Sequence, residues 1–296
     1  MSAKITVAGQ INDPMFHKSM QIARHLEQLH PEQISVQCEQ FFETQWMIYL
    51  KKISNELKGV FYDHDQAHPL IYLNGADYIG DADQFSKWAL FNFNYIEKDG
   101  LNTYNKLAVD CYKQFVNQST TRQYACIKFQ FEENKEEVSQ EVVFELFSHI
   151  APKTCENFLQ LCQSFERNSN KIGYAGTEVH RIVRGMYLQM GRIVDGEGTN
   201  SIYEAEFADE SFHVKHTEVG LLGMCKRSGI KHSNESQFYI TLGAPLAFLD
   251  NENVVFGRVI SGMDTLSRIG QLETLNEKSV YGAVKITESG KFTVSN

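Results

Sequence analysis

The pattern of hydrophobic residues changes near residue 122, and this change constrains the fold of the 296-residue chain more than any other feature. Before it, short strand-like runs alternate with stretches of helical period. After it, short strand-like runs follow one another with two helical interruptions. Alternating strands and helices are typical of an α/β domain, whereas many short strands separated by turns are typical of a β-sandwich or barrel. We therefore predict two domains of different class, which the length allows.

The first ninety-odd residues are predicted to form a βαβ unit, then a hairpin, then a last helix. Pro14 suits the first turn of the first helix, and Asn74-Gly75 suits a hairpin turn. Either Asp81 or Asp83 is the N-cap of the last helix, which continues through Ala89. The βαβ order predicts a parallel strand pair with a right-handed crossover. The other expected elements are strand Ile5–Ala8, helix Pro14–His30, strand Ile34–Phe42, helix Thr44–Lys58, strand Leu70–Leu73 and strand Tyr78–Gly80.

The segment between the two patterns is predicted to be an amphipathic connecting helix. Its apolar positions recur at helical spacing from Leu101 to Val116, and the polar run 117–121 ends it. We expect the first domain to cover residues 1–97, the connecting helix residues 98–121 and the second domain residues 122–296.

The second domain is predicted to be an eight-stranded antiparallel β-barrel capped by two helices. The helices are expected at Lys153–Phe165 after Pro152 and at Met263–Leu272 after Gly262. The expected strands are Tyr124–Phe131, Glu141–Phe147, Thr177–Val183, Tyr187–Ile193, Gly220–Met224, Gln237–Leu242, Val254–Ile260 and Ala283–Glu288.

Charge and composition exclude several classes of function. The formal net charge is -9, so the chain lacks the positive field that concentrates nucleic acid or anionic lipid. We expect neither nucleic acid nor a membrane as a partner, since no run approaches the roughly 18 apolar residues of a membrane helix. The N-terminal residues also lack the pattern of a secretory signal, which predicts a cytoplasmic protein.

The residues that bind metals and phosphates do not occur in binding patterns. The six cysteines are scattered without a CxxC, and the two on one helical face, Cys155 and Cys162, do not complete a zinc site. His213 and His216 have no acidic or thiol partner at ligand spacing. The glycines of Gly196–Gly198 precede no predicted helix, so they are not expected to cradle a phosphate. We expect no metal and no other cofactor.

One segment of the first domain resembles glutaredoxins. PLIYLNGADYIGDADQFSKWA, from Pro69 to Ala89, is similar to their proline-led strand, turn, second strand and capped last helix. The resemblance implies a thioredoxin/glutaredoxin-like domain. The CxxC of that family would fall near Asp13–Phe16, where no cysteine stands, and thiolate chemistry needs a thiol. We expect a domain without redox chemistry that serves as an interaction surface.

Six ordered blocks of the second domain resemble the cyclophilin-type peptidyl-prolyl isomerases. The blocks span most of residues 122–296, and the two-part arrangement is similar to a cyclophilin associated with ciliary radial spokes. They are VVFELFSHIAPKTCENF (Val142–Phe158), VHRIVRG (Val179–Gly185), SIYEAEFADESF (Ser201–Phe212), KHTEVGLLGM (Lys215–Met224), SQFYITL (Ser236–Leu242) and NVVFGRVISGM (Asn253–Met263).

The resemblance implies a reaction and a site. Rotation about an X–Pro bond has a barrier of about 18–20 kcal/mol, because the amide is conjugated. A catalyst must bind the twisted amide better than the planar one, and a cation that donates to the prolyl nitrogen does so. In cyclophilins an arginine has this role, and Arg181 matches it. Gln189 matches the glutamine that binds the substrate backbone. The pocket for the proline ring matches Met186, Tyr187, Tyr239 and Leu249, and Gln237 belongs to the same binding surface.

The walls of the implied site depart from the pattern of active members. Met186-Tyr187 replaces phenylalanine-methionine, and Tyr239 replaces the pocket phenylalanine. The loop Lys226–Glu235 is two residues longer, and Lys226 adds a second cation near the peptide-binding edge. In addition, Phe248 replaces the tryptophan of drug-binding members, Asn253 replaces a histidine, and Cys225-Lys226 replaces alanine-asparagine.

An unchanged centre with altered walls leaves two hypotheses open. The first is a prolyl isomerase of weak or altered activity that acts on proline-containing peptide or protein segments. The second is an inactive structural subunit or peptide-binding module, held among other axonemal proteins of a cilium partly through its first domain. A proline-isomerisation assay distinguishes the two.

Overall fold

The chain folds into two compact units. Contacts between residues divide it after Gln118. The computed structural model describes residues 3–54, 56–57, 69–117, 122–167, 170–193, 200–227, 229–272, 274–275, 278–279 and 283–294.

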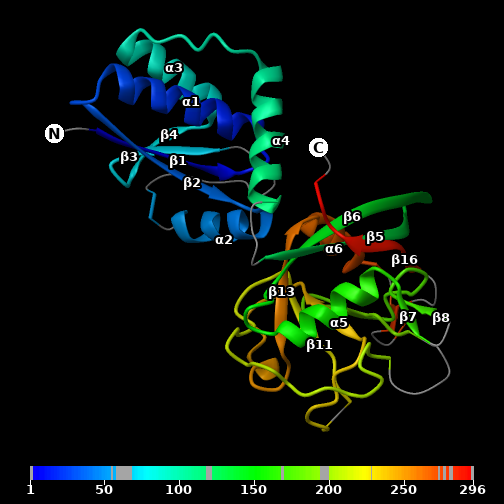
Figure 1. Cartoon of the computed structure of the whole chain (residues 1–296). Helices are drawn as coiled ribbons and strands as arrows, with labels where there is room; N and C mark the ends of the chain where they lie inside the picture. Colours follow the sequence, from blue (N-terminus) through cyan, green and yellow to red (C-terminus); the bar gives the residue numbers. More distant parts are fainter. Residues whose placement is uncertain are drawn as a thin grey trace. The chain divides into compact units, whose positions relative to one another are not determined.

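The first unit is a mixed four-stranded sheet with helices on both faces (Figure 1). In chain order its elements are β1 (Ala3–Gln10), α1 (Pro14–Leu29), β2 (Ile34–Phe41), α2 (Glu43–Ile53), β3 (Leu70–Leu73), β4 (Asp77–Gly80), α3 (Ala82–Phe93) and α4 (Leu101–Asn117). The strand order is β2-β1-β3-β4, with β1 parallel to β2 and antiparallel to β3. The predicted parallel pair and hairpin are both confirmed.

Local sequence explains where these helices begin and end. Asp13 caps α1 by accepting a hydrogen bond from the Met15 N–H at 2.9 Å, and Pro14 occupies the first turn. Of the two predicted caps for α3, Asp81 is the residue used, and it forms a capping box with Gln84. α2 ends at Ile53, before its predicted end at Lys58, which lies outside the described residues. The Ser54 hydroxyl donates to the Lys51 carbonyl, a local bond that competes with helix continuation.

Two apolar clusters hold the layers of the first unit together. On one face, α1 and α3 pack Phe16, Leu26 and Phe85 against β1 and β3. On the other face, α2 packs Trp46 and Leu50. The predicted connecting helix is α4, which lies against α1 (Figure 1).

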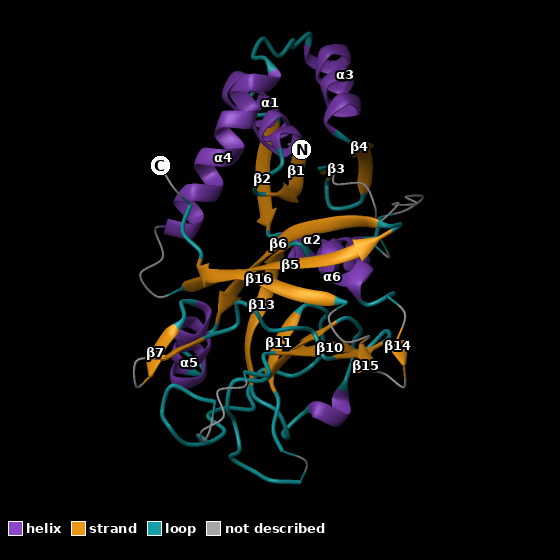
Figure 2. Ribbon diagram, turned by 90° about the vertical axis from the view of Figure 1, so that its right-hand side faces the viewer, coloured by secondary structure: helices purple, strands orange, loops and turns teal. Residues whose placement is uncertain are grey.

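The second unit is built on a curled antiparallel sheet. In chain order its elements are β5 (Gln123–Glu133), β6 (Glu136–Leu146), α5 (Pro152–Cys162), β7 (Phe165–Arg167), β8 (Asn170–Ile172), β9 (Arg181–Val183), β10 (Tyr187–Met190), β11 (Leu221–Met224), β12 (Phe238–Thr241), the 3-10 helix η1 (Ala247–Leu249), β13 (Val255–Ser261), α6 (Met263–Ile269), β14 (Thr274–Leu275), β15 (Lys278–Ser279) and β16 (Val284–Lys291). The eight strands that match the prediction lie in the order β9-β10-β12-β11-β13-β6-β5-β16, and β14-β15 extends the row beyond β9. Figure 2 shows the curl of this sheet with α5 and α6 beside it.

The curl brings the two ends of the eight-strand row together. The Val179 N–H donates to the Val284 carbonyl at 3.1 Å, and the Ile286 N–H donates to the Thr177 carbonyl at 2.8 Å. The predicted strand Thr177–Val183 is therefore divided: its first residues bond to β16 and its last three form β9.

The helices of the second unit match the prediction, apart from their ends. α5 stops at Cys162 rather than at the predicted Phe165, because Ser164 adopts a left-handed φ of 65° and leads into the β7–β8 hairpin. α6 likewise stops at Ile269, where Gly270 follows. Phe158 of α5 is fully buried among Phe144, Phe238 and Phe256, so the apolar face of this helix packs into the interior of the curled sheet.

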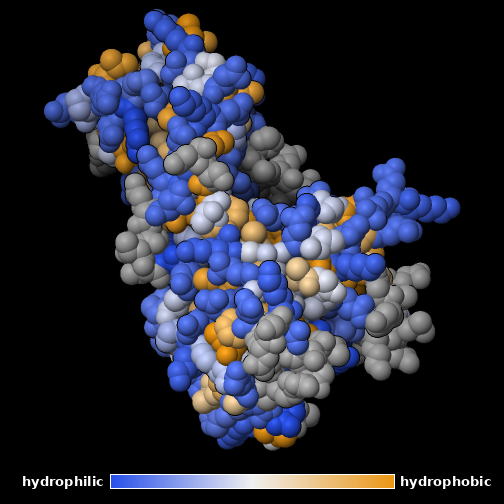
Figure 3. Space-filling model, turned by 45° about the vertical axis from the view of Figure 1, so that its right-hand side comes forward, coloured by the Kyte–Doolittle hydropathy of each residue, from blue (hydrophilic) through white to orange (hydrophobic). Residues whose placement is uncertain are grey.

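The hydropathy of the visible surface is consistent with hydrophobic cores that lie inside the two units. Figure 3 shows hydrophobic side chains in small separate groups among hydrophilic ones on the face in view. Among the helices that the structure describes, none combines the length and the apolar character that crossing a bilayer requires.

Candidate functional site

Four neighbouring strands of the second unit align three candidate residues and a glycine in one row. Arg181 of β9 pairs with Gln189 of β10, which pairs with Tyr239 of β12, which pairs with Gly223 of β11. Residues directly opposite each other in antiparallel strands point to the same face. The row therefore brings Arg181, Gln189 and Tyr239 together, as the sequence predicts, and adds a glycine that the sequence did not indicate.

Aromatic rings and amide groups surround the arginine of this row. The Arg181 guanidinium carbon lies 5.7 Å from the ring centre of Tyr187. The Tyr187 ring centre lies 5.6 Å from that of Tyr239. The Gln189 side-chain amide donates to the Gln237 side-chain oxygen at 3.2 Å. Two polar amides thus stand beside a cation that rests on an aromatic ring.

The neighbouring histidine adds no charge to this surface at neutral pH. Burial lowers the pKa of His180 to about 4, helped by the positive charge of Arg192. His180 is therefore neutral where Arg181 is charged, and the arginine is the cation that this pair of residues offers.

Tyr239 is buried, and its hydroxyl is bound inside the protein. The hydroxyl lies 2.6 Å from Nε2 of His216, whose Nδ1 lies 2.8 Å from Oδ1 of Asp250. Burial raises the pKa of Tyr239 well above its usual value, so the hydroxyl keeps its proton. The two histidines considered as metal ligands thus differ: His213 is exposed, whereas His216 has an acidic partner that lies 34 residues away in the chain.

The other predicted pocket and wall residues lie on two short segments at the rim of the row. Phe248 and Leu249 belong to η1, and Phe248 is 58% exposed. The Asn253 side-chain amide donates to the Met224 carbonyl at 2.7 Å, which fastens this segment to the end of β11. Met186 lies in the β9–β10 turn, where its carbonyl accepts from the Leu242 N–H at 2.7 Å.

Lys226, the second cation that the sequence places near the peptide-binding edge, forms an ion pair with a neighbouring carboxylate. Its ammonium donates to the Asp209 carboxylate at 3.1 Å, and both side chains are buried. Although burial opposes ionisation, hydrogen bonds from Asn234, the His232 backbone and Lys226 lower the pKa of Asp209. Asp209 thereby holds the described part of the long loop, and the charge of Lys226 is paired within the fold.

Cys225 lies at the edge of the same surface but is not a nucleophile. Its backbone N–H donates to the Gln237 carbonyl at 2.9 Å. Burial raises the pKa of the Cys225 thiol, against the opposing effect of Arg181, so the thiol stays protonated.

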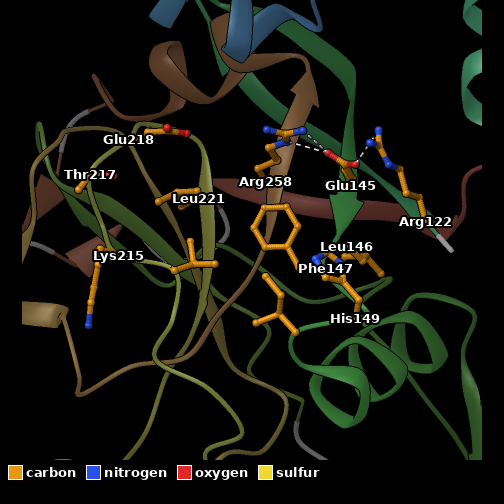
Figure 4. Close-up of a pocket in the computed structure, with 12 residues that line it drawn as sticks. Arg122, Glu145, Leu146, Phe147, His149, Lys215, Thr217, Glu218, Leu221 and Arg258 are labelled. Carbon is orange, nitrogen blue, oxygen red and sulfur yellow. Dashed lines mark hydrogen bonds and ion pairs between the residues drawn. The ribbon is translucent and has the colours of Figure 1, made fainter.

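A separate cavity of about 600 Å³ lies in the second unit. Its walls include Phe147, Lys215 and Leu221, and on one side Glu145 is held between Arg122 and Arg258 (Figure 4). No predicted site residue lines it. The segment that lines it with Lys215 and Thr217 also contains His216, whose side chain bonds to Tyr239 instead.

Comparison with known proteins settles the family. Residues 128–291 match the family model described as "Cyclophilin type peptidyl-prolyl cis-trans isomerase/CLD". The chain belongs to the cyclophilin-type peptidyl-prolyl cis-trans isomerase family. It is 31% identical to the human "Probable inactive peptidyl-prolyl cis-trans isomerase-like 6" over 97% of this chain and 91% of that protein, and 32% identical to the Bos taurus protein of the same name over 97% and 92%. It is also 44% identical to "Peptidyl-prolyl cis-trans isomerase H" of Rhizopus delemar over 50% of this chain and 83% of that protein.

Membership of the cyclophilin family implies a chemical role for the row that contains Arg181, called the arginine row below. When an X–Pro amide twists, its nitrogen gains a lone pair, which a fixed guanidinium can bind. Arginine suits this task because it is always charged and offers a rigid set of donors. The geometry places this group beside two glutamine amides that can hold a peptide backbone.

The sequence did not indicate that two further residues contribute to this surface. His216 and Asp250 are 34 residues apart, and only the fold brings them under Tyr239. A tyrosine in place of the pocket phenylalanine was the available signal, because a buried hydroxyl needs a partner.

The predictions about metal and phosphate binding concern different parts of the chain. Within the part that the structure describes, no cluster of three or more His, Cys, Asp or Glu side chains could hold a metal ion. The Gly196–Gly198 loop lies outside the described residues.

Proposed function

We propose that this cyclophilin binds proline-containing peptide segments at the Arg181 row and catalyses X–Pro isomerisation weakly or with altered selectivity. The observation that carries the proposal is the register that aligns Arg181, Gln189 and Tyr239 on one face. The walls beside this row carry the changed residues, which is why we propose reduced activity. The relatives that match nearly the whole chain are named probable inactive isomerases, in agreement with a reduced rate.

The second candidate function is that of a peptide-binding structural subunit in a cytoplasmic or ciliary assembly, with other axonemal proteins as partners. The first unit supports a role in assembly. Of the nine large hydrophobic side chains that the described residues expose, seven lie in this unit, and Phe91 is 89% exposed. Single exposed side chains are common, but contact surfaces for proteins are rich in them.

The first unit is, in our proposal, a thioredoxin-like domain without redox function. Its strand order β2-β1-β3-β4 and the helices on both faces support this assignment. Asp13 caps α1 at the place where the resemblance would put a cysteine.

The deciding experiment is two-dimensional NMR exchange spectroscopy on a peptide that contains one X–Pro bond, with and without the full chain. Enhanced cis–trans exchange at substoichiometric protein supports the isomerase. Shifts that saturate without faster exchange support the binding module alone. If peptides with several different residues before proline show neither shifts nor faster exchange, both functions are excluded.

Rebuilding the pocket wall should raise the isomerisation rate. Met186→Phe, Tyr187→Met, Phe248→Trp and Asn253→His restore the family pattern, and Tyr239 is kept because its hydroxyl has a partner in His216. Electrostatic help from Arg181 requires the proline ring within about 0.5 Å of its productive position, which the wall determines. We expect the quadruple variant to isomerise the peptide about tenfold faster than the wild type. The resemblance also implies that this variant gains cyclosporin binding through the new tryptophan.

Single changes in this set should have small effects, because neighbouring pocket residues are coupled. The four single variants are therefore the controls, measured by the same NMR exchange. If the quadruple variant folds normally but neither isomerises the peptide faster nor binds the drug, the defect lies in the backbone of the Lys226–Glu235 loop.

The chain should not catalyse thiol–disulfide exchange. Burial is the largest cause that raises the pKa of all six cysteine thiols, and thiolates are the reactive form. Insulin reduction by dithiothreitol, followed as turbidity, should proceed at the buffer rate when the full chain is added. Acceleration that is lost when the chain is first alkylated would contradict the assignment.

A further inference from the structure

A chain of three hydrogen-bonded side chains links the η1 segment beside the candidate site to its central strand. It runs from Asp250 through His216 to Tyr239, with distances of 2.8 Å and 2.6 Å. His216 is 1% exposed and Tyr239 is 3% exposed, so water does not compete for the bond between them, whereas the Asp250 side chain is 21% exposed. The described function of the arginine row does not itself use the histidine.

The chemistry of the three groups fixes the direction of the bonds. Hydrogen bonds from the His216 backbone N–H and ring lower the pKa of Asp250, so its carboxylate accepts and cannot donate. Nδ1 of His216 must then carry a proton. In the neutral ring Nε2 accepts, and the Tyr239 hydroxyl donates to it. With the ring in this neutral form, the hydroxyl proton of Tyr239 is directed to His216 and is not offered to a ligand.

On the rim side, His216 holds the segment that contains η1. Its carbonyl accepts from the Leu246 N–H at 2.8 Å, and its own N–H donates to Asp250 at 2.8 Å. With the ring bond, one histidine makes three hydrogen bonds to residues 246–250. Phe248 and Leu249, two predicted pocket residues, lie between these anchor points.

On the strand side, the tyrosine fits only because β11 has a glycine opposite it. A Cβ placed on Gly223 would collide with Cζ and the hydroxyl of Tyr239. The ring stacks on His216 with centres 5.9 Å apart and planes 23° apart. Gly223, Tyr239 and His216 therefore form a matched set, and Tyr239 stands directly opposite Gln189 in the row that holds Arg181.

We propose that His216 is a positioning residue of the peptide site: through Asp250 and Tyr239 it fixes the η1 wall at a set place relative to the Arg181 row. The inference rests on the proposed function and deepens it, since the wall decides which residue the pocket accepts. With its hydroxyl bonded to His216, Tyr239 contributes mainly aromatic surface to the pocket. This suits an unsubstituted proline ring better than a polar side chain.

The test breaks the chain at each end and leaves the histidine in place. Tyr239→Phe removes only the hydroxyl, and Asp250→Ala removes the carboxylate. Each should raise the peptide Kd about threefold to tenfold, the effect of one hydrogen bond. Each should also speed hydrogen exchange of the Leu249, Asp250 and Asn253 amides, which bond within this segment.

Three further variants separate positioning from general stability. Asp250→Asn keeps an acceptor oxygen and should retain most of the exchange protection and the affinity. His213→Gln, an exposed histidine on the same stretch, should change neither quantity. In the double variant Tyr239→Phe/Asp250→Ala, the two effects should not add, because both act through His216.

Unchanged exchange and unchanged Kd in both single variants would overturn the proposal, and so would strictly additive effects in the double variant. The exchange measurement needs no ligand, which separates the two levels of inference. If exchange responds as expected while the wild type binds no X–Pro peptide, the proposed function fails and the fixing of η1 by His216 stands.

Discussion

Replacing Arg181 with alanine is expected to lower kcat/KM for an X–Pro peptide at least tenfold, which corresponds to about 1.4 kcal/mol of transition-state stabilisation. The upper end of the expected loss in kcat/KM is about 100- to 1000-fold, which is usual when a preorganised hydrogen-bond donor is removed. Arg181 is the cation of the four-strand row, and His180 beside it is neutral because burial lowers its pKa to about 4. The neighbouring glutamines carry no charge that could replace the guanidinium.

The expected loss should lie in kcat more than in peptide affinity. The prolyl nitrogen gains its lone pair only when the amide twists, so the guanidinium binds the transition state better than the ground state. Peptide Kd, measured by NMR titration, should change little in Arg181→Ala. Arg181→Lys keeps the charge without the rigid donor fork, and we expect an intermediate rate.

Arg184→Ala is the matched control for this prediction. Arg184 is exposed in the β9–β10 turn, where its guanidinium donates to the Leu272 carbonyl at 3.2 Å. It should leave the rate unchanged. A rate in Arg181→Ala equal to that of the wild type would mean that another group acts on the prolyl nitrogen.

Hydrophobic period predicted the main elements of both units because the buried faces of this protein are regular. β10 alternates between half-buried and buried positions, so Tyr187 and Gln189 share one face while Leu188 and Met190 face the core. Elements that depend on backbone detail were missed. The β7–β8 hairpin follows a left-handed Ser164, and η1 has only three residues.

The candidate site likewise has residues that the sequence predicted and residues that it did not. Arg181 and Tyr239 could be found because they belong to sequence blocks of the family, and Gln189 because it follows one of these blocks at the position of the family glutamine; strand register then aligns the three. The partners of Lys226 and Tyr239 could not be found, since Asp209 and His216 reach them across 17 and 23 residues with no sequence period between them. Contacts between loops leave no pattern in a single sequence.

Replacing Glu145 with glutamine is expected to lower the free energy of unfolding of the second unit by about 3 kcal/mol, the lower end for breaking a buried ion pair. Glu145 is 4% exposed on β6, opposite Arg258 of β13. Its Oε2 accepts from Nε of Arg258 at 2.7 Å, and its Oε1 lies 3.3 Å from a guanidinium nitrogen of Arg122 (Figure 4). A neutral amide leaves two guanidinium groups facing each other without the carboxylate between them. We place the value at the lower end because both arginines reach solvent in part.

The measurement is urea-dependent hydrogen exchange of the β6 and β13 amides, because both tryptophans, Trp46 and Trp88, lie in the first unit. Tryptophan fluorescence should therefore report an unchanged first unit. Glu288→Gln is the matched control: it breaks a surface pair with Lys128 at 3.0 Å and should cost less than about 1 kcal/mol. If Glu145→Gln were no more damaging than Glu288→Gln, the β6–β13 junction would be held by the strand pairing and apolar packing without help from the ion pairs. The carboxylate would then be a feature of the cavity wall rather than of the fold that aligns the arginine row.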